Sequence, residues 1–129
     1  MDKTTLVKED EINGEELIKR LDDHGFPVDA AFWLYSTDSG VWRLMIASQV
    51  VDQKGPKGAY HLVQTVLAKM PPDFGISLHN ITMLSPKADL VKLFRSVIHT
   101  GPKAISRIRF TRNAINNTFI EDAYIYRVH

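Results

Sequence analysis

The chain has 129 residues, 44% of them hydrophobic and 24% charged, which fits one globular domain that folds on its own core. It contains no cysteine, which excludes disulfides, thiolate metal sites and a cysteine nucleophile. The sequence shows no signal peptide, and no stretch approaches the roughly 20 apolar residues of a membrane helix. We expect a cytoplasmic, bacterial protein with no membrane contact and a single domain over 1–129, with residues 1–10 as a candidate disordered arm.

The net charge of +1 hides an asymmetry between the two parts of the chain. Residues 1–85 carry 8 basic and 12 acidic residues, a net charge of −4, whereas residues 86–129 carry 8 and 3, a net charge of +5. Such an imbalance indicates either a surface for an acidic partner, or two parts that pair within the fold or between copies.

The first helix is predicted to begin at Asn13, which can cap it, with Glu16 three residues later in a capping-box position. Gly25 supplies the stop. Asp22 and Asp23 lie at the C-terminal end, where the helix dipole disfavours negative charge. That mismatch is compatible with solvated surface.

A hairpin follows, with strands over 30–35 and 41–47 around turn residues 37–40. Both strands are apolar on both faces, which predicts central positions in a sheet. Four aromatic residues gather here: Phe32, Trp33, Tyr35 and Trp42. An uncovered aromatic stripe predicts homodimerisation through the sheet, and a stripe covered by the first helix is the equal alternative.

The remaining elements alternate between helices and strands. Residues 52–58 are predicted to form a polar loop, and 59–67 an amphipathic helix ended by two prolines. A short strand follows over 81–84, and Ser85 is predicted to cap a third helix with Pro86 at its first position. A second hairpin joins 105–115 to 118–128 through Asn116-Asn117. The predicted fold is α+β: one mainly antiparallel five-stranded sheet with three helices, in the order α-β-β-α-β-α-β-β.

The C-terminal hairpin carries the main candidate binding residues. A two-residue turn places Arg107 opposite Tyr126 and Arg109 opposite Tyr124, on one face. The other face is a predicted core face made of Ile108, Phe110, Ala114, Phe119, Ala123 and Ile125, with Arg112 paired to Glu121 near the turn.

Arginine beside tyrosine suits stacking on nucleic-acid bases and contact with phosphates. It suits a protein interface equally well, because both residue types are common anchors there. Ordinary cross-strand pairing on a solvated face is the third interpretation.

A second candidate site lies at the open end of the first hairpin. Asp29 begins one strand, and Asp52 and Lys54 follow the other, so two carboxylates and a lysine could hold Mg²⁺ and activate water. The pattern resembles the Asp…Asp/Glu-x-Lys set of restriction-type nucleases, although that fold usually has a third strand before its next helix. Three common polar residues in loops also match such a pattern by chance.

Arg95 and His99 are predicted one helical turn apart on the third helix. With Arg107 or Arg109 nearby they could form an anion pocket, in which His99 could act as a base. The simpler interpretation is a solvated helix flank. None of the five histidines lies at a metal-binding spacing, and no cofactor fingerprint is present.

No convergent catalytic set emerges, so we expect a non-catalytic binding protein that acts by protein contact, as a homo-oligomer or a subunit of a larger system. Nucleic-acid binding through Arg107, Arg109, Tyr124 and Tyr126 is the alternative. A metal-dependent nuclease using Asp29, Asp52 and Lys54 is the third hypothesis. No cofactor and no resident metal are expected.

Overall fold

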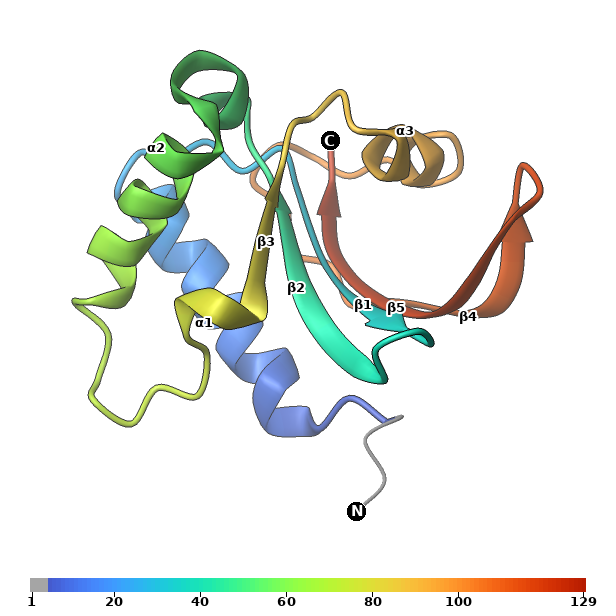
Figure 1. Ribbon diagram of the computed structural model, residues 1–129, viewed down its shortest axis with the longest axis horizontal. Coiled ribbons are helices and arrows are strands. Elements are labelled where there is room, and N and C mark those ends of the chain that lie inside the picture. Colours follow the sequence, from blue (N-terminus) through green and yellow to red (C-terminus); the bar gives the residue numbers. More distant parts are fainter. Residues whose placement is uncertain (1–4) are drawn as a thin grey trace.

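A computed structural model describes residues 5–129 and contains one five-stranded sheet (Figure 1). The element order confirms the predicted α-β-β-α-β-α-β-β. The helices are α1 (Lys8–Asp23), α2 (Gln49–Leu67) and α3 (Asp89–Arg95), with a 3₁₀ turn at Leu78–Asn80. The strands are β1 (Ala30–Ser36), β2 (Val41–Ala47), β3 (Ile81–Leu84), β4 (Ile108–Ile115) and β5 (Thr118–Val128).

The strands lie in the order β3-β2-β1-β5-β4, so the first hairpin is central, as its composition predicts. The β1–β2, β1–β5 and β4–β5 pairs are antiparallel, whereas β2 and β3 are parallel. The sheet is therefore mixed. A parallel pair needs a crossover connection, and α2 supplies it between β2 and β3.

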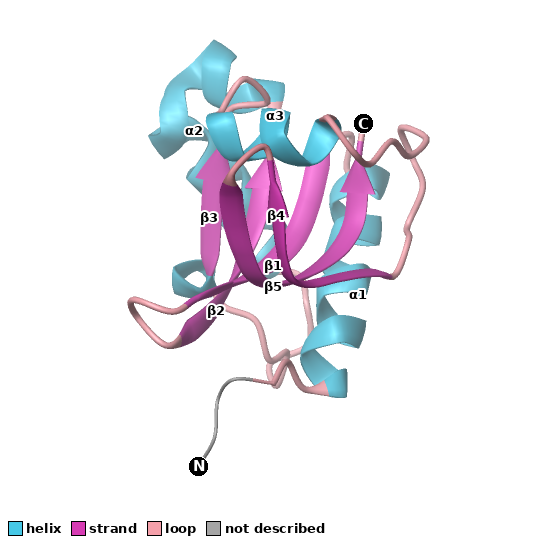
Figure 2. Ribbon diagram, turned by 90° about the vertical axis from the view of Figure 1, so that its right-hand side faces the viewer, coloured by secondary structure: helices cyan, strands magenta, loops and turns pink. Residues whose placement is uncertain are grey.

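Helices pack on both faces of the sheet (Figures 1 and 2). One apolar cluster joins α1 and α2 to the sheet and contains Leu17, Trp33 and Val63. The other lies beneath α3 and contains Phe32 and Phe94, whose ring centroids are 4.9 Å apart. Neighbouring residues of β1 thus face opposite clusters, because side chains alternate along a strand. The aromatic residues at the centre of the sheet are covered on both sides.

Helix α1 begins five residues before the predicted cap at Asn13, which lies inside the helix. The first turn of the helix contains the acidic residues Glu9, Asp10 and Glu11, whose negative charges interact favourably with the positive end of the helix dipole. Leu6 is buried just before it. The predicted arm over 1–10 is therefore wrong for the segment from Leu6 onward, and residues 1–4 lie outside the described residues.

The predicted loop over 52–58 is wrong, because α2 already begins at Gln49. The Ser48 side chain accepts a hydrogen bond from the Val50 N–H, and Asp29 accepts one from the Gln49 N–H. These two hydrogen bonds stabilise the first turn of α2, although the polar composition of residues 52–58 favours a loop. The break is real but local: Gly55 has φ 78° and ψ 166°, a conformation essentially restricted to glycine, and Pro56 begins the next segment.

Ser85 and Pro86 form a turn rather than the start of the third helix, since α3 begins at Asp89. The Ser85 hydroxyl accepts a hydrogen bond from the Lys87 N–H within that turn. The helix ends at Arg95, so His99 lies beyond it and is exposed. The predicted placement of Arg95 and His99 on adjacent helical turns is therefore wrong.

The C-terminal hairpin turns at Asn116 and Asn117, both with positive φ, in the predicted register. Arg112 also has a positive φ of 46°, and beyond it the faces of the ribbon exchange. Ile115 and Ile120 enter the α3 cluster, whereas Phe119, a predicted core residue, is 61% exposed. The end of the hairpin bends toward the side of α3 (Figure 1).

A bulge interrupts the other end of β5. Ala31 pairs with Arg127 and Phe32 pairs with Ile125, which leaves Tyr126 as the additional residue. Tyr126 and Arg127 both reach α1 as a result: Tyr126 contacts the Glu11 carbonyl and Arg127 contacts Asp22.

Candidate functional site

The two tyrosines predicted to face outward, Tyr124 and Tyr126, lie inside the molecule. The register places Arg109 opposite Tyr124, as expected, but Tyr124 is only 8% exposed and Tyr126 is completely buried. Both phenols face the cluster beneath α1. The prediction that they point outward with the arginines is wrong, because the first helix covers this face of β5.

Tyr126 makes a structural network with α1. Its hydroxyl accepts a hydrogen bond from Trp33 Nε1 at 3.0 Å and donates one to the Glu11 carbonyl at 2.6 Å. Burial raises the pKa of Tyr126 far above its ordinary value, since a phenolate would lose its solvation. The hydroxyl therefore remains protonated and joins the sheet to the helix.

The two arginines of this face are each held by an acid. Arg107 makes a bidentate contact to Glu15 of α1, with nitrogen–oxygen distances of 3.2 and 3.1 Å. Arg109 makes a bidentate contact to Asp122 and lies 5.8 Å from the centroid of the Trp42 ring. The hydrogen bonds to Asp122 raise the pKa of Arg109. These pairs neutralise the charges that phosphate recognition would use, so this geometry lends nucleic-acid binding no support.

Ion pairs within the fold compensate part of the charge asymmetry between the two parts of the sequence. Ion pairs join Arg107 to Glu15, and both Arg127 and Lys103 to Asp22. Each pair connects the basic C-terminal part with the acidic N-terminal part. Asp22 is thus a partner of a buried arginine rather than solvated surface.

Arg95 and His99 do not form an anion pocket with Arg107 or Arg109. Arg95 donates hydrogen bonds to the carbonyls of His129 and Pro86, on the side of the sheet that α3 covers. Arg107 lies on the opposite side, where it pairs with Glu15 of α1. The sheet separates the two sets.

The candidate nuclease residues all lie at or in the first segment of α2, but no metal site forms there within the described residues. Asp29 is engaged at the N-terminus of α2, and Asp52 lies in the first turn of that helix. Lys54 ends the first segment of α2 and lines a pocket. Within residues 5–129, no three or more histidine or acidic side chains are grouped to hold a metal ion. No hydrogen bond joins the carboxylates of Asp29 and Asp52 to Lys54 in that part of the chain.

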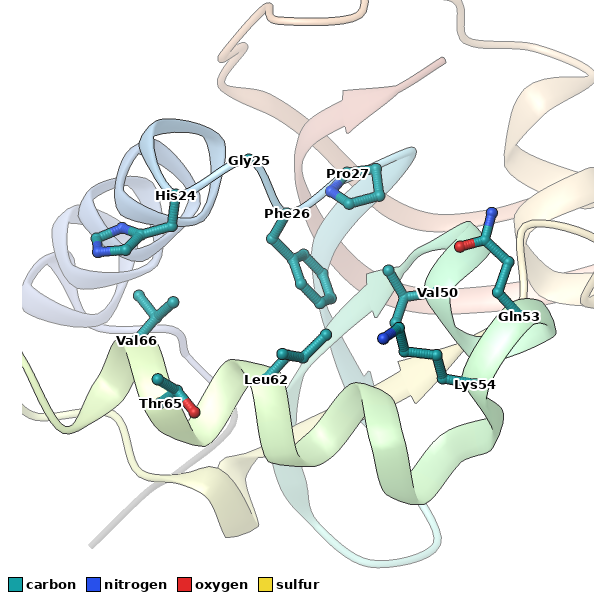
Figure 3. Close-up of a pocket in the computed structure, with 10 residues that line it drawn as sticks. All are labelled: His24, Gly25, Phe26, Pro27, Val50, Gln53, Lys54, Leu62, Thr65 and Val66. Carbon is teal, nitrogen blue, oxygen red and sulfur yellow. The ribbon is translucent and has the colours of Figure 1, made fainter.

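That pocket lies between the end of α1 and the two segments of α2 and has a volume of about 380 Å³ (Figure 3). Its apolar lining comes from Phe26, Val50, Leu62 and Val66, and its polar lining includes Lys54. The sequence contains the signal for it, a Gly55-Pro56 break after a lysine, but that signal was compatible with an ordinary loop.

The two edges of the sheet differ. At the β3 edge, the Met83 N–H donates a hydrogen bond to the Tyr60 hydroxyl of α2, and Arg43 donates one to the Ile81 carbonyl. At the other edge, β4 pairs with β5 alone among the described strands; its hairpin end lies at the far side of the molecule from α1 and α2 (Figure 1), whereas Arg107, just before its start, pairs with Glu15 of α1. Sequence reasoning missed this edge, because strand order is not a local property.

None of the helices within residues 5–129 combines the length and apolar character needed to cross a membrane. The chain matches no family model, no curated protein and no solved structure.

Proposed function

We propose that this chain is a non-catalytic cytoplasmic binding protein that associates with a second copy of itself through the outer edge of β4. The observation that carries the proposal is the eight-residue edge strand Ile108–Ile115, which no other described strand pairs on its outer side. An edge of this kind is a ready template for another strand. The lack of cysteine suits a reducing compartment.

The usual protection of an edge is incomplete here. The first part of β4 carries one charged side chain, Arg109, and the backbone is irregular only at the end, where Asn113 Oδ1 accepts a hydrogen bond from the Ala114 N–H and the positive φ of Arg112 bends the strand. The first part, Ile108–Thr111, stays extended before that bend. A partner strand can therefore pair only along the few residues before the bend, which favours a weak dimer with a small interface.

The sequence of this segment favours an antiparallel register centred on Phe110 over one centred on Arg109. Directly opposed residues share a face, so a two-fold axis between identical strands must pass through a residue. An axis at Arg109 would oppose two guanidinium groups. An axis at Phe110 opposes two phenylalanine rings and places Arg109 opposite Thr111 of the other copy, which creates a favourable aromatic pair and no like-charge contact.

The charges of the edge are compatible with such a pair. Arg109 and Arg112 project from β4, and each is matched by an acid of β5, Asp122 and Glu121 respectively. Two copies can therefore approach without bringing unpaired positive charges together. The resulting dimer would contain one continuous sheet of ten strands, twice the five of the monomer.

We expect Thr111→Arg to abolish dimerisation. The added charge would face Arg109 of the second copy, and like charges opposed across strands are destabilising. Asn113→Arg is the matched control: it adds the same charge to the same strand beyond the bend, and each change removes one side-chain hydrogen bond. Light scattering after size exclusion should show mass rising with concentration for the parent and the control, and a constant 14.7 kDa for Thr111→Arg.

The proposal is wrong if the parent chain remains at monomer mass at every concentration. It is also wrong if Thr111→Arg associates as readily as Asn113→Arg, since the interface would then lie elsewhere.

A further inference from the structure

The pocket between α1 and α2 is a second candidate binding site, and none of its lining residues belongs to β4. Its walls come from the turn His24–Pro27 on one side and from both segments of α2 on the other (Figure 3). The break at Gly55 separates the two segments of α2 that line this space. The positive φ of 78° at Gly55 holds the two segments apart, and a side chain there would strain the backbone.

The lining is suited to a small organic molecule. A volume of about 380 Å³ lies within the usual range of ligand pockets. Phe26, Val50 and Val66 are buried, and each presents apolar surface to the space. Phe26 lies centrally among the lining residues, with Leu62 below it in the view (Figure 3). Such walls favour an apolar body, such as a single ring or a short branched chain.

The charge of the lining is positive. Lys54 is its one formally charged residue, and no ion pair engages Lys54 within residues 5–129. The lysine side chain extends from α2 toward Val50, so its ammonium group borders the apolar part (Figure 3). Neither aspartate nor glutamate lines the pocket. An ammonium group without a carboxylate partner, beside apolar surface, favours an anionic occupant.

His24 lines the end of the pocket opposite Lys54 (Figure 3). Its Nδ1 lies 2.7 Å from the Arg20 carbonyl oxygen, which can only accept, so Nδ1 carries the proton. Nε2 is then the free ring nitrogen. Gln53 adds an amide to the polar lining, and no hydrogen bond engages that amide in the described part of the chain. These groups provide further hydrogen-bonding positions beside the Lys54 ammonium group.

We propose that this pocket binds a small amphipathic carboxylate, whose apolar body lies against Phe26, Val50 and Leu62 and whose carboxylate pairs with Lys54. Lys54 supplies one positive charge, which a single carboxylate balances, whereas the two or more negative charges of a phosphate monoester would lack a second cation in this lining. Neither the dimer edge nor any catalytic step is required for this binding.

The test uses phenylacetate and its neutral analogue phenylacetamide on the full chain, with binding followed by chemical-shift changes of the lining residues. We expect phenylacetate to bind with a dissociation constant of about 1 mM, the range of a small fragment, and about threefold more tightly than phenylacetamide, because Lys54 is exposed and solvent weakens its ion pair. Lys54→Gln should remove that preference for the anion while leaving the amide affinity unchanged.

Lys57→Gln is the matched control, because Lys57 is an exposed lysine of the same helix outside the lining. It should retain the full preference. Equal binding of the acid and the amide, equal binding by Lys54→Gln and the parent, or no shift in the lining residues with phenylacetate would each overturn the proposal. Leu62→Trp, which fills the pocket, should abolish binding of both compounds.

Discussion

Asp22→Ala is expected to lower the free energy of unfolding by about 3–4 kcal/mol, because it leaves a buried guanidinium without its counter-charge. Arg127 is completely buried, and its Nη1 and Nη2 lie 3.0 and 2.8 Å from the two carboxylate oxygens of Asp22. Its Nε also donates to the Ala104 carbonyl. A carbonyl partner satisfies hydrogen bonding but cannot balance the charge.

The adjacent Asp23→Ala is the control for this prediction. Asp23 is exposed at the same end of α1, so its removal changes the net charge and the helix dipole equally without touching Arg127. Chemical denaturation of the two variants should separate them by about 3 kcal/mol. A loss below about 1 kcal/mol for Asp22→Ala would mean that water reaches the guanidinium and that the pair resembles a surface salt bridge.

Gly14→Ala is expected to destabilise the protein by about 2–3 kcal/mol, although alanine is the better helix former by about 1 kcal/mol. Gly14 lies inside α1 where the helix meets the sheet, and it is buried. A methyl group there would overlap the Tyr126 hydroxyl and crowd Trp33 Nε1. The helix would have to move away from β5, or the hydroxyl would lose its hydrogen bonds.

Tyr126→Phe tests the cause of that effect. Alone, it should cost about 1–3 kcal/mol, since Trp33 Nε1 and the Glu11 carbonyl lose their buried partner. Combined with Gly14→Ala, it removes the atom that the new methyl group meets most closely. The double variant should therefore be more stable than the sum of the two losses predicts, by about 1 kcal/mol. Strict additivity would show that the helix yields without contacting the hydroxyl.

The local elements follow from the sequence, and the contacts between them do not. Alternation and turn chemistry predicted both hairpins, and the register at Asn116-Asn117 was correct. The start of α2 was missed although its N-cap, Ser48, is a local signal; the second capping group, Asp29, is 20 residues away from the Gln49 N–H that donates to it. The bend at Arg112 was missed because a positive φ in a non-glycine residue has no sequence signal there.

The prediction of an outward-facing surface of tyrosines and arginines was wrong for the same reason, since it depends on contacts between elements. Alternation placed the tyrosines and arginines on one face of the ribbon, but only the packing of α1 decides whether that face is open. Glu15 and Glu11 lie 92 and 115 residues from the C-terminal groups that they contact. The contact of Arg127 with α1 also has no signal in the alternation of side chains, because the bulge at Tyr126 shifts that alternation along β5.

The most direct measurement of the β4 interface is disulfide formation by Phe110→Cys. The chain has no cysteine of its own, so a single introduced thiol can form a disulfide only between two molecules. A two-fold axis at this residue brings the two Cβ atoms to about 4.5–5.5 Å, close to disulfide geometry. We predict a covalent dimer under mild oxidation of the folded protein, with little from the matched Asn113→Cys. Cross-linking of Phe110→Cys no faster than that of Asn113→Cys would contradict the proposed dimer.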